Sequence, residues 1–147
     1  MADLQIVVLD AAQTHPLRLT VLRDGTPSTA VTFDGDDLPG TLHLGLRRGD
    51  ELVAVSTWIP NPHHGEAAVQ LRGMATAPHL QGLGFGAALL EEGCERARAI
   101  ASLVWARARD TALPFYLHHG FSIEGDGFVD ATTALPHHVI VRRLSDP

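Results

Sequence analysis

Hydrophobic positions along the chain fall into short runs of two kinds, which predict strands and helices in a definite order. Runs rich in β-branched or alternating apolar residues, bounded by turn residues, predict strands. These runs cover residues 4–9, 41–47, 51–59, 67–75, 102–106, 121–129 and 138–144. Apolar and small residues at helical spacing predict a long helix over 86–101, and shorter helices over 14–23 and 111–119. Residues 26–40, rich in Gly, Pro, Asp and Thr, predict a loop.

The order of these elements predicts a fold class. Only the strand–helix–strand unit from residue 67 to 106 requires a parallel pair, because a crossover helix joins its two strands. The other strands follow one another closely enough to pair antiparallel. We therefore expect an α/β (α+β) fold, with a mixed, mostly antiparallel central sheet and helices packed on both faces. A length of 147 residues suits a single domain, 1–147.

Charge and composition exclude several classes of function. The formal charge of −6, from 17 acidic and 11 basic residues, makes nucleic acid and anionic membranes poor partners. All the basic residues are arginines, which excludes a Schiff-base lysine and a Walker A loop. No run of about 18 apolar residues occurs to span a membrane. The N-terminus lacks a signal-peptide pattern and Cys94 is the only cysteine, so we expect a cytoplasmic protein with Cys94 buried.

A glycine-rich segment between a predicted strand and the long helix carries the strongest chemical signal. It reads Gln-Gly-Leu-Gly-Phe-Gly over residues 81–86. Glycines let the backbone approach a ligand, and the first N–H groups of a helix lack internal partners, so together they form a phosphate site. The same residues satisfy a dinucleotide fingerprint, but residues 76–81, with Pro78 among them, separate the glycines from the strand, and only one crossover is present. A helix start built only for packing is the remaining alternative.

These residues resemble the signature of the GNAT acetyltransferase superfamily, Gln/Arg-x-x-Gly-x-Gly/Ala opening a helix. Two further segments support the resemblance: residues 106–121, which contain Phe-Tyr-Leu-His-His-Gly-Phe, and the closing strand over 135–144. The resemblance extends over about residues 41–144. It implies acetyl-CoA as acyl donor, a small-molecule or peptide amine as acceptor, no metal, and a homodimer of the kind common in the family.

The resemblance also implies roles for particular residues. Backbone groups on the strand before the loop would pair with the pantetheine arm: Met74, Ala75 and Thr76. Backbone N–H groups of the loop would hold the pyrophosphate: Gln81, Gly82, Leu83, Gly84, Phe85 and Gly86. Tyr116 would protonate the departing thiolate. Arg107 stands where relatives often carry Asn; it is a cofactor-binding candidate that could instead reach a phosphate or point elsewhere.

The reaction requires a neutral amine, and removing the proton of an alkyl ammonium at pH 7 costs about 4.6 kcal/mol. A base or a desolvating pocket is therefore expected. We select His137 as a substrate-facing residue, because an imidazole titrates near neutral pH, and Glu66 as a second candidate. The paired histidines do not predict a metal site, because adjacent residues on a strand point to opposite faces.

The sequence thus predicts an acetyl-CoA-dependent N-acetyltransferase with Tyr116 as general acid. A catalytically inactive acyl-CoA-binding sensor or adaptor is the alternative, and a small nucleotide-binding domain is a third interpretation. The acidic overall charge favours a cationic amine as acceptor.

Overall fold

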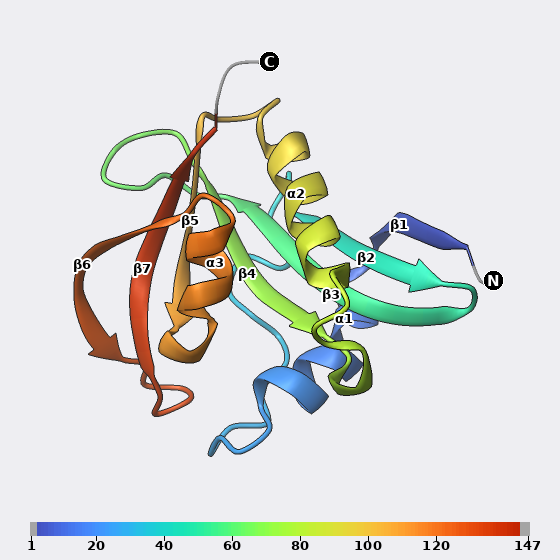
Figure 1. Ribbon diagram of the computed structural model, residues 1–147. Helices are drawn as coiled ribbons and strands as arrows, with labels where there is room; N and C mark the ends of the chain where they lie inside the picture. Colours follow the sequence, from blue (N-terminus) through green and yellow to red (C-terminus); the bar gives the residue numbers. More distant parts are fainter. Residues whose placement is uncertain (1–2, 145–147) are drawn as a thin grey trace.

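The computed structural model describes residues 3–144, and Met1, Ala2 and residues 145–147 lie outside the described part. Its seven strands form one sheet with the order β1-β2-β3-β4-β5-β7-β6 (Figure 1). The strands are β1 (Leu4–Leu9), β2 (Leu42–Arg48), β3 (Glu51–Pro60), β4 (Val69–Thr76), β5 (Leu103–Arg109), β6 (Ser122–Val129) and β7 (Pro136–Arg143). The helices are α1 (Ala11–Leu17), α2 (Phe85–Ala97) and α3 (Leu113–His118). Three short turns of other helical types are η1 (Arg18–Leu22), η2 (Pro78–Leu80) and η3 (Asp110–Ala112).

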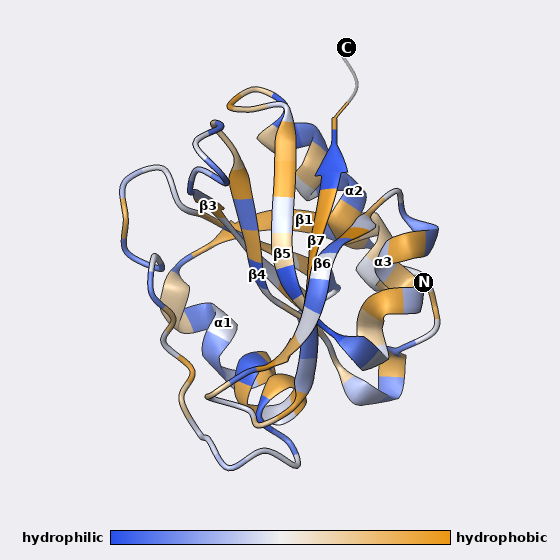
Figure 2. Cartoon of the chain, turned by 90° about the vertical axis from the view of Figure 1, so that its left-hand side faces the viewer, coloured by the Kyte–Doolittle hydropathy of each residue, from blue (hydrophilic) through white to orange (hydrophobic). Residues whose placement is uncertain are grey.

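The sheet is mixed and mostly antiparallel, as the order of elements predicts. Every neighbouring pair is antiparallel except β4 and β5, which are parallel and joined through α2. Helices α2 and α3 cover one face of the sheet and α1 lies on the other (Figures 1 and 2). The predicted fold class is therefore confirmed.

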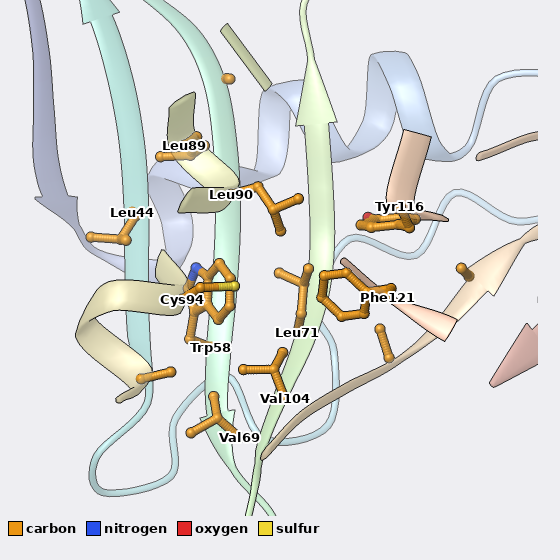
Figure 3. Close-up of a cluster of buried hydrophobic side chains, with 14 of the residues drawn as sticks. Leu44, Trp58, Val69, Leu71, Leu89, Leu90, Cys94, Val104, Tyr116 and Phe121 are labelled. Atoms are coloured by element: carbon orange, nitrogen blue, oxygen red, sulfur yellow. The ribbon is translucent and has the colours of Figure 1, made fainter. Parts of the chain in front are cut away.

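The main hydrophobic core lies between the sheet and α2 (Figure 3). Leu89 and Leu90 of α2 are fully buried, and they pack with Trp58 and Leu71 of the sheet. Close approach is possible because position 93 is glycine: a Cβ there would lie 1.8 Å from the indole of Trp58. The predicted apolar face of this helix is confirmed at its centre, but it does not include Ile100, which is 57% exposed because α2 ends at Ala97.

The N-terminal helix differs in detail from its prediction over 14–23. It begins at Ala11, because Gln13 closes the first turn: its side chain accepts from the Asp10 N–H at 2.8 Å. Pro16 consequently lies inside the helix, where it has no N–H to donate. The chain continues as a π-helical turn, η1, that carries Arg18 into the interior.

A bulge in β4 separates this strand from β5. Val55 pairs with Ala75 and Thr57 with Arg72, so two residues of β4, Gly73 and Met74, face one residue of β3. Gly73 has a φ of +61°, which an L side chain rarely adopts. Strands β4 and β5 are paired only at Val69↔Val104 and Gln70↔Trp105, on the near side of the bulge. Beyond these two pairs, the parallel strands diverge.

We predict that Gly93→Ala destabilises the fold. The methyl group must displace the Trp58 ring, and overpacking of this kind costs about 1–3 kcal/mol, against the better helix propensity of alanine. Urea unfolding of the two proteins measures the difference.

The variant Trp58→Leu serves as the control, because a smaller side chain makes room for the new methyl group. Gly93→Ala should cost much less in that background than in the wild type. Equal costs in the two backgrounds would show that the contact with Trp58 does not limit position 93.

Candidate active site

A cavity of about 740 Å³ opens where β4 and β5 diverge. Its lining includes residues of β4, β5, residues 33–38 and the turn between β6 and β7, together with Leu22 and Arg23 at the end of η1, Tyr116 of α3 and His137 of β7. Strand β5 changes from hydrophobic at its start to hydrophilic at its end, where it borders the cavity (Figure 2). A volume of this size suits a small molecule.

Tyr116 reaches this cavity from α3. Its ring packs edge-to-face on Phe115 and Phe121, with centroid distances of 5.1 and 5.4 Å, and its hydroxyl end is directed toward β4 (Figure 3). No hydrogen-bond partner for this hydroxyl is recorded within residues 3–144. Burial raises the pKa of Tyr116 above its ordinary value, with a further contribution from Cys94, so the phenol is protonated at neutral pH.

His137 lies in the same cavity, on a strand that begins earlier than predicted. Strand β7 starts at Pro136, and His137 pairs with both Phe128 and Arg109. The imidazole is 6% exposed, and its Nδ1 lies 2.9 Å from the carbonyl oxygen of Leu135. Because a carbonyl only accepts, Nδ1 carries the proton, and Nε2 of the neutral ring is an acceptor.

The glycine loop forms an open cradle at the start of α2. Gly84 caps the helix with a φ of +87°, no side chain caps the helix, and Gly82 has a φ of +81°. A Cβ added at either glycine would meet no atom within 4 Å, and Leu83 between them is 62% exposed. The free N–H groups at this helix start therefore face open space, which fits the phosphates of a coenzyme. Arg48 adds positive charge nearby, with its guanidinium 5.8 Å from the ring centre of Phe85.

The strand before the loop presents an unpaired edge toward β5. Met74, Ala75 and Thr76 all lie beyond the last β4–β5 pair, so the β5 ladder does not use their backbone groups. The Thr76 carbonyl accepts from the Gln81 side chain at 3.0 Å, which links the end of β4 to the glycine loop. This arrangement fits an extended chain lying along β4 as an added strand.

Two sequence candidates lie elsewhere than the glycine loop. Arg107 borders the cavity between β4 and β5 and not the loop. Glu66 lies outside the cavity lining, at the turn before β4, where both carboxylate oxygens accept from Arg143 at 2.6 and 2.8 Å.

Cys94 is 1% exposed, and burial raises the pKa of its thiol to about 11, so it is a packed core residue and not a nucleophile.

A buried ion pair that the sequence did not reveal holds one wall of the cavity. Arg18 is fully buried and donates to both oxygens of Asp36, at 2.7 and 2.9 Å. It also donates to the Thr57 hydroxyl at 2.8 Å and lies 4.1 Å from the ring centre of Phe33. His43 bonds Thr57 and the backbone carbonyl of Asp36. The pair therefore fixes the loop before β2 against the sheet.

Four arginines line the cavity, of which the sequence analysis singled out only one. They are Arg23, Arg72, Arg107 and Arg109. Asp130, in the turn between β6 and β7, also lines the cavity. Burial alone would raise the pKa of this carboxyl group, but hydrogen bonds from Thr133 and Thr132 outweigh burial and lower it. Sequence spacing gave no signal for this group, because its members come from four segments far apart in the chain.

One pair of adjacent histidines converges, contrary to the sequence argument. His63 and His64 lie in a turn and not on a strand, and His64 has a φ of +50°. Their Nε2 atoms lie 2.7 and 2.9 Å from the same oxygen of Glu124, and the three potential ligand atoms lie within 4.8 Å of one another. The alternation rule was wrong here because it assumed extended backbone. Two imidazoles and a carboxylate are a ligand set that a divalent metal accepts.

Comparisons with known proteins agree on one family. The model of the acetyltransferase (GNAT) domain matches residues 39–123. The uncharacterized N-acetyltransferase YitI of Bacillus subtilis strain 168 is 26% identical over 129 residues, which are 85% of this chain and 87% of YitI. The crystal structure of Escherichia coli ElaA matches with a TM-score of 0.78 at 20% identity, over 97% of this chain and 100% of that one. FeeM, an N-acyl amino acid synthase from uncultured soil microbes, matches with a TM-score of 0.81 at 13% identity, over 98% and 92%.

The divergent strands, the open glycine loop and the family match define an acyltransferase. The chain belongs to the GNAT acetyltransferase family, which confirms the resemblance seen in its sequence. Proteins of this fold generally use an acyl-CoA as cosubstrate and act on small-molecule or peptide amines. No helix within residues 3–144 is long and apolar enough to cross a membrane.

We predict that Asp36→Asn destabilises the protein by about 3–5 kcal/mol, because it leaves the Arg18 charge buried without a counter-charge. Burial would raise the pKa of Asp36, but the hydrogen bond from Arg18 prevails and lowers it. The contribution of Asp36 to stability is therefore present above its unfolded pKa of about 4 and is lost as the pH falls through the lower folded value. Urea unfolding between pH 3 and 7 measures both effects.

Asp37→Asn is the matched control, because Asp37 is exposed and adjacent in sequence. It should leave the free energy of unfolding within about 0.5 kcal/mol of wild type. Similar losses in the two variants would mean that the Arg18–Asp36 pair does not hold the loop.

Proposed function

We propose that this protein transfers the acetyl group of acetyl-CoA to a primary amine. The observation that carries the proposal is that the cavity holding Tyr116 and His137 opens between β4 and β5, the strands joined by the glycine loop and α2. A donor bound along β4, with its phosphates at the glycine loop, would bring its thioester to this cavity. A single site could then hold both reactants at close range.

The donor is positioned by backbone groups in this proposal. The N–H groups of residues 81–86 hold the pyrophosphate, and the free edge of β4 at Met74, Ala75 and Thr76 pairs with the pantetheine arm. Both interactions use backbone atoms, which explains why glycines and an interrupted strand pairing matter here more than particular side chains. Arg107 takes no part in holding the donor phosphates, because it lies in the cavity wall.

His137 and Tyr116 move the protons. The Nε2 atom of His137 accepts a proton from the amine, directly or through water, since Nδ1 is committed to the Leu135 carbonyl. The amine nitrogen bonds to the thioester carbonyl carbon, and the carbon–sulfur bond then breaks. The Tyr116 hydroxyl gives its proton to the departing sulfur. Burial raises the pKa of Tyr116, so the phenol is protonated at neutral pH, but the same shift makes it a weaker acid toward the thiolate.

A sensor or adaptor that binds acyl-CoA without turning it over is the second candidate. The Tyr116 hydroxyl, which has no hydrogen-bond partner within residues 3–144, and the acceptor nitrogen of His137 favour the enzyme, because a binding protein has no use for either in the cavity. A dinucleotide-binding protein fits less well, because its loop would follow the strand directly.

Donor binding can be tested at the glycine loop. We expect calorimetry to detect binding of acetyl-CoA and CoA but not of NAD. Leu83→Glu should raise the dissociation constant of acetyl-CoA about tenfold, because it places a negative charge beside the phosphates.

Leu83→Gln is the control of equal size without the charge, and it should bind nearly as well as wild type. Leu83 is largely exposed, so neither change threatens folding. An unchanged affinity of the Leu83→Glu variant would exclude the loop as the phosphate site.

The role of Tyr116 can be tested by Tyr116→Phe, which keeps the ring and its aromatic contacts. General acids contribute about 10²–10⁴-fold to rate, so we expect turnover, followed by release of free thiol, to fall at least about a hundredfold. The affinity for acetyl-CoA and the unfolding temperature should not change, because no hydrogen bond of the hydroxyl is lost within residues 3–144. Equal turnover of the two proteins across the pH range would remove Tyr116 from the mechanism.

A further inference from the structure

The cavity between β4 and β5 has a charge opposite to that of the whole chain. Four arginines line it, together with two carboxylates, those of Asp34 and Asp130. The lining therefore carries two positive charges in excess, whereas the chain has a formal charge of −6. The preference for a cationic amine, drawn from the overall charge, does not hold at the site itself, because nearby charges govern the potential there.

The arginines converge on one region of the cavity. The guanidinium groups of Arg23 and Arg72 lie 5.1 and 5.0 Å from the ring centre of Phe33, which can stabilise cations over its face. Burial lowers the pKa of Arg72 and of Arg23; the nearby charge of Arg107 lowers the pKa of Arg72 further, and that of Arg109 lowers the pKa of Arg23 further. Arg23, directly after η1, thus lies near arginines of β4 and β5, and like charges placed together are unfavourable without a counter-ion.

The partners of these arginines are backbone carbonyls and not carboxylates. Arg72 donates to the Asp34 carbonyl at 3.2 Å, Arg23 to the Ala30 carbonyl at 2.7 Å, and Arg109 to the Leu22 carbonyl. Within residues 3–144, none of the four cavity arginines forms an ion pair. By contrast, six of the seven other arginines do, including Arg18 with Asp36.

The two carboxylates of the lining compensate this charge only in part, because Asp34 acts on Arg72, and Asp130 on Arg23 and Arg109, from beyond ion-pair distance. Asp130 uses its Oδ2 atom to accept from Thr132 and Thr133, within its own turn. Neither Asp34 nor Asp130 reaches an arginine of the cavity within 4.0 Å. Burial lowers the pKa of Arg72, Arg23 and Arg109. All these groups still carry their charge at neutral pH, and an anion in the cavity would be held by several N–H donors at once.

The phosphates of the donor are poor candidates for this anion. The glycine loop, residues 81–86, supplies a separate phosphate cradle, and none of its residues lines the cavity. The excess charge therefore belongs to the acceptor half of the site.

We propose that the acceptor is an amine that carries an anionic group, a carboxylate or a phosphate, held by Arg72 and Arg107. This inference rests on the proposed function. The anionic group anchors the molecule between β4 and β5, so that its amine faces His137 and the thioester. The neutral amine nitrogen bonds to the acetyl carbon as the carbon–sulfur bond breaks, and one N–H proton passes to His137. The sulfur leaves with the proton of Tyr116, and the phenolate regains a proton from water. Amino acids and aminoalkyl phosphates are the two substrate classes with this chemistry.

Matched amines test the proposal. The panel pairs leucine with isoamylamine, phenylalanine with phenylethylamine, and phosphoethanolamine with ethanolamine, and thiol release from acetyl-CoA gives kcat/KM for each. The anionic member of at least one pair should be at least about tenfold better. Leucine or phenylalanine as the preferred substrate assigns a carboxylate, and phosphoethanolamine assigns a phosphate. Equal or better rates for every uncharged-tail amine would overturn the inference while leaving the acetyltransferase proposal intact.

Variants locate the anion independently of the panel. Arg107→Gln and Arg72→Gln should raise KM for the anionic acceptor about 10- to 100-fold, the loss expected for a charged hydrogen bond. Their affinity for acetyl-CoA should not change. Arg47→Gln, on β2 outside the cavity, is the control and should change neither value. If Arg107→Gln instead lost affinity for acetyl-CoA while KM for the acceptor stayed unchanged, Arg107 would be a donor-binding residue and the assignment would be overturned.

A binding measurement separates failure of this inference from failure of the enzyme proposal. N-acetyl-leucine, N-acetyl-phenylalanine and N-acetyl-phosphoethanolamine carry the anion but need no turnover, and we expect at least one to bind wild type in calorimetry with CoA present. Binding that is lost in Arg107→Gln supports the anion site even if no amine is acetylated. Absence of binding by all three, with Leu83→Gln and wild type both binding CoA, would overturn it.

Discussion

The separation of two neighbouring parallel strands is the constraint on which the rest of this molecule depends. A sheet ordinarily continues its hydrogen-bond ladder until a strand ends, but β4 and β5 stop after two residue pairs. The bulge at Gly73 and Met74 bends β4, and no other strand enters the gap. Backbone groups of β4 are thus left without partners from β5, and the cavity opens at that same interruption. Helix α3, residues 33–38 and the turn between β6 and β7 surround the gap where the two strands no longer pair.

The buried Arg18–Asp36 pair resolves a second problem, which is how to build a cavity wall from a loop. Residues 26–40 contain few apolar side chains that could anchor them by burial. A guanidinium that reaches Asp36, Thr57 and the Val31 carbonyl supplies fixed contacts instead. The pair also compensates the charge of Arg18, so the remaining cavity charge comes from arginines that form no ion pair within residues 3–144.

The local sequence pattern predicted the helices and strands well, but it did not predict which side chains from distant segments come together. Periodicity and capping depend on residues that are close in sequence. They were enough to predict the order of strands and helices, the parallel crossover, and a helix starting after the glycine loop. His137 was found by its chemistry, although its strand began two residues earlier than expected. Arg23, Arg72 and Arg109 were missed because they approach one another only through η1 and the divergence of β4 and β5. His63 and His64 were misjudged because a left-handed residue in a turn reverses the alternation of a strand.

The boundary of the family match divides the site in two. Residues 39–123 contain the glycine loop, both diverging strands and Tyr116, whereas Arg23, Phe33, Asp130 and His137 lie outside it. The matched part also contains Arg72 and Arg107, the residues proposed to hold the acceptor, and the flanking segments add Arg23, Phe33, Asp130 and His137 to the same cavity. A change of acceptor on this scaffold would therefore involve the flanks together with positions 72 and 107, while the glycine loop could stay unaltered.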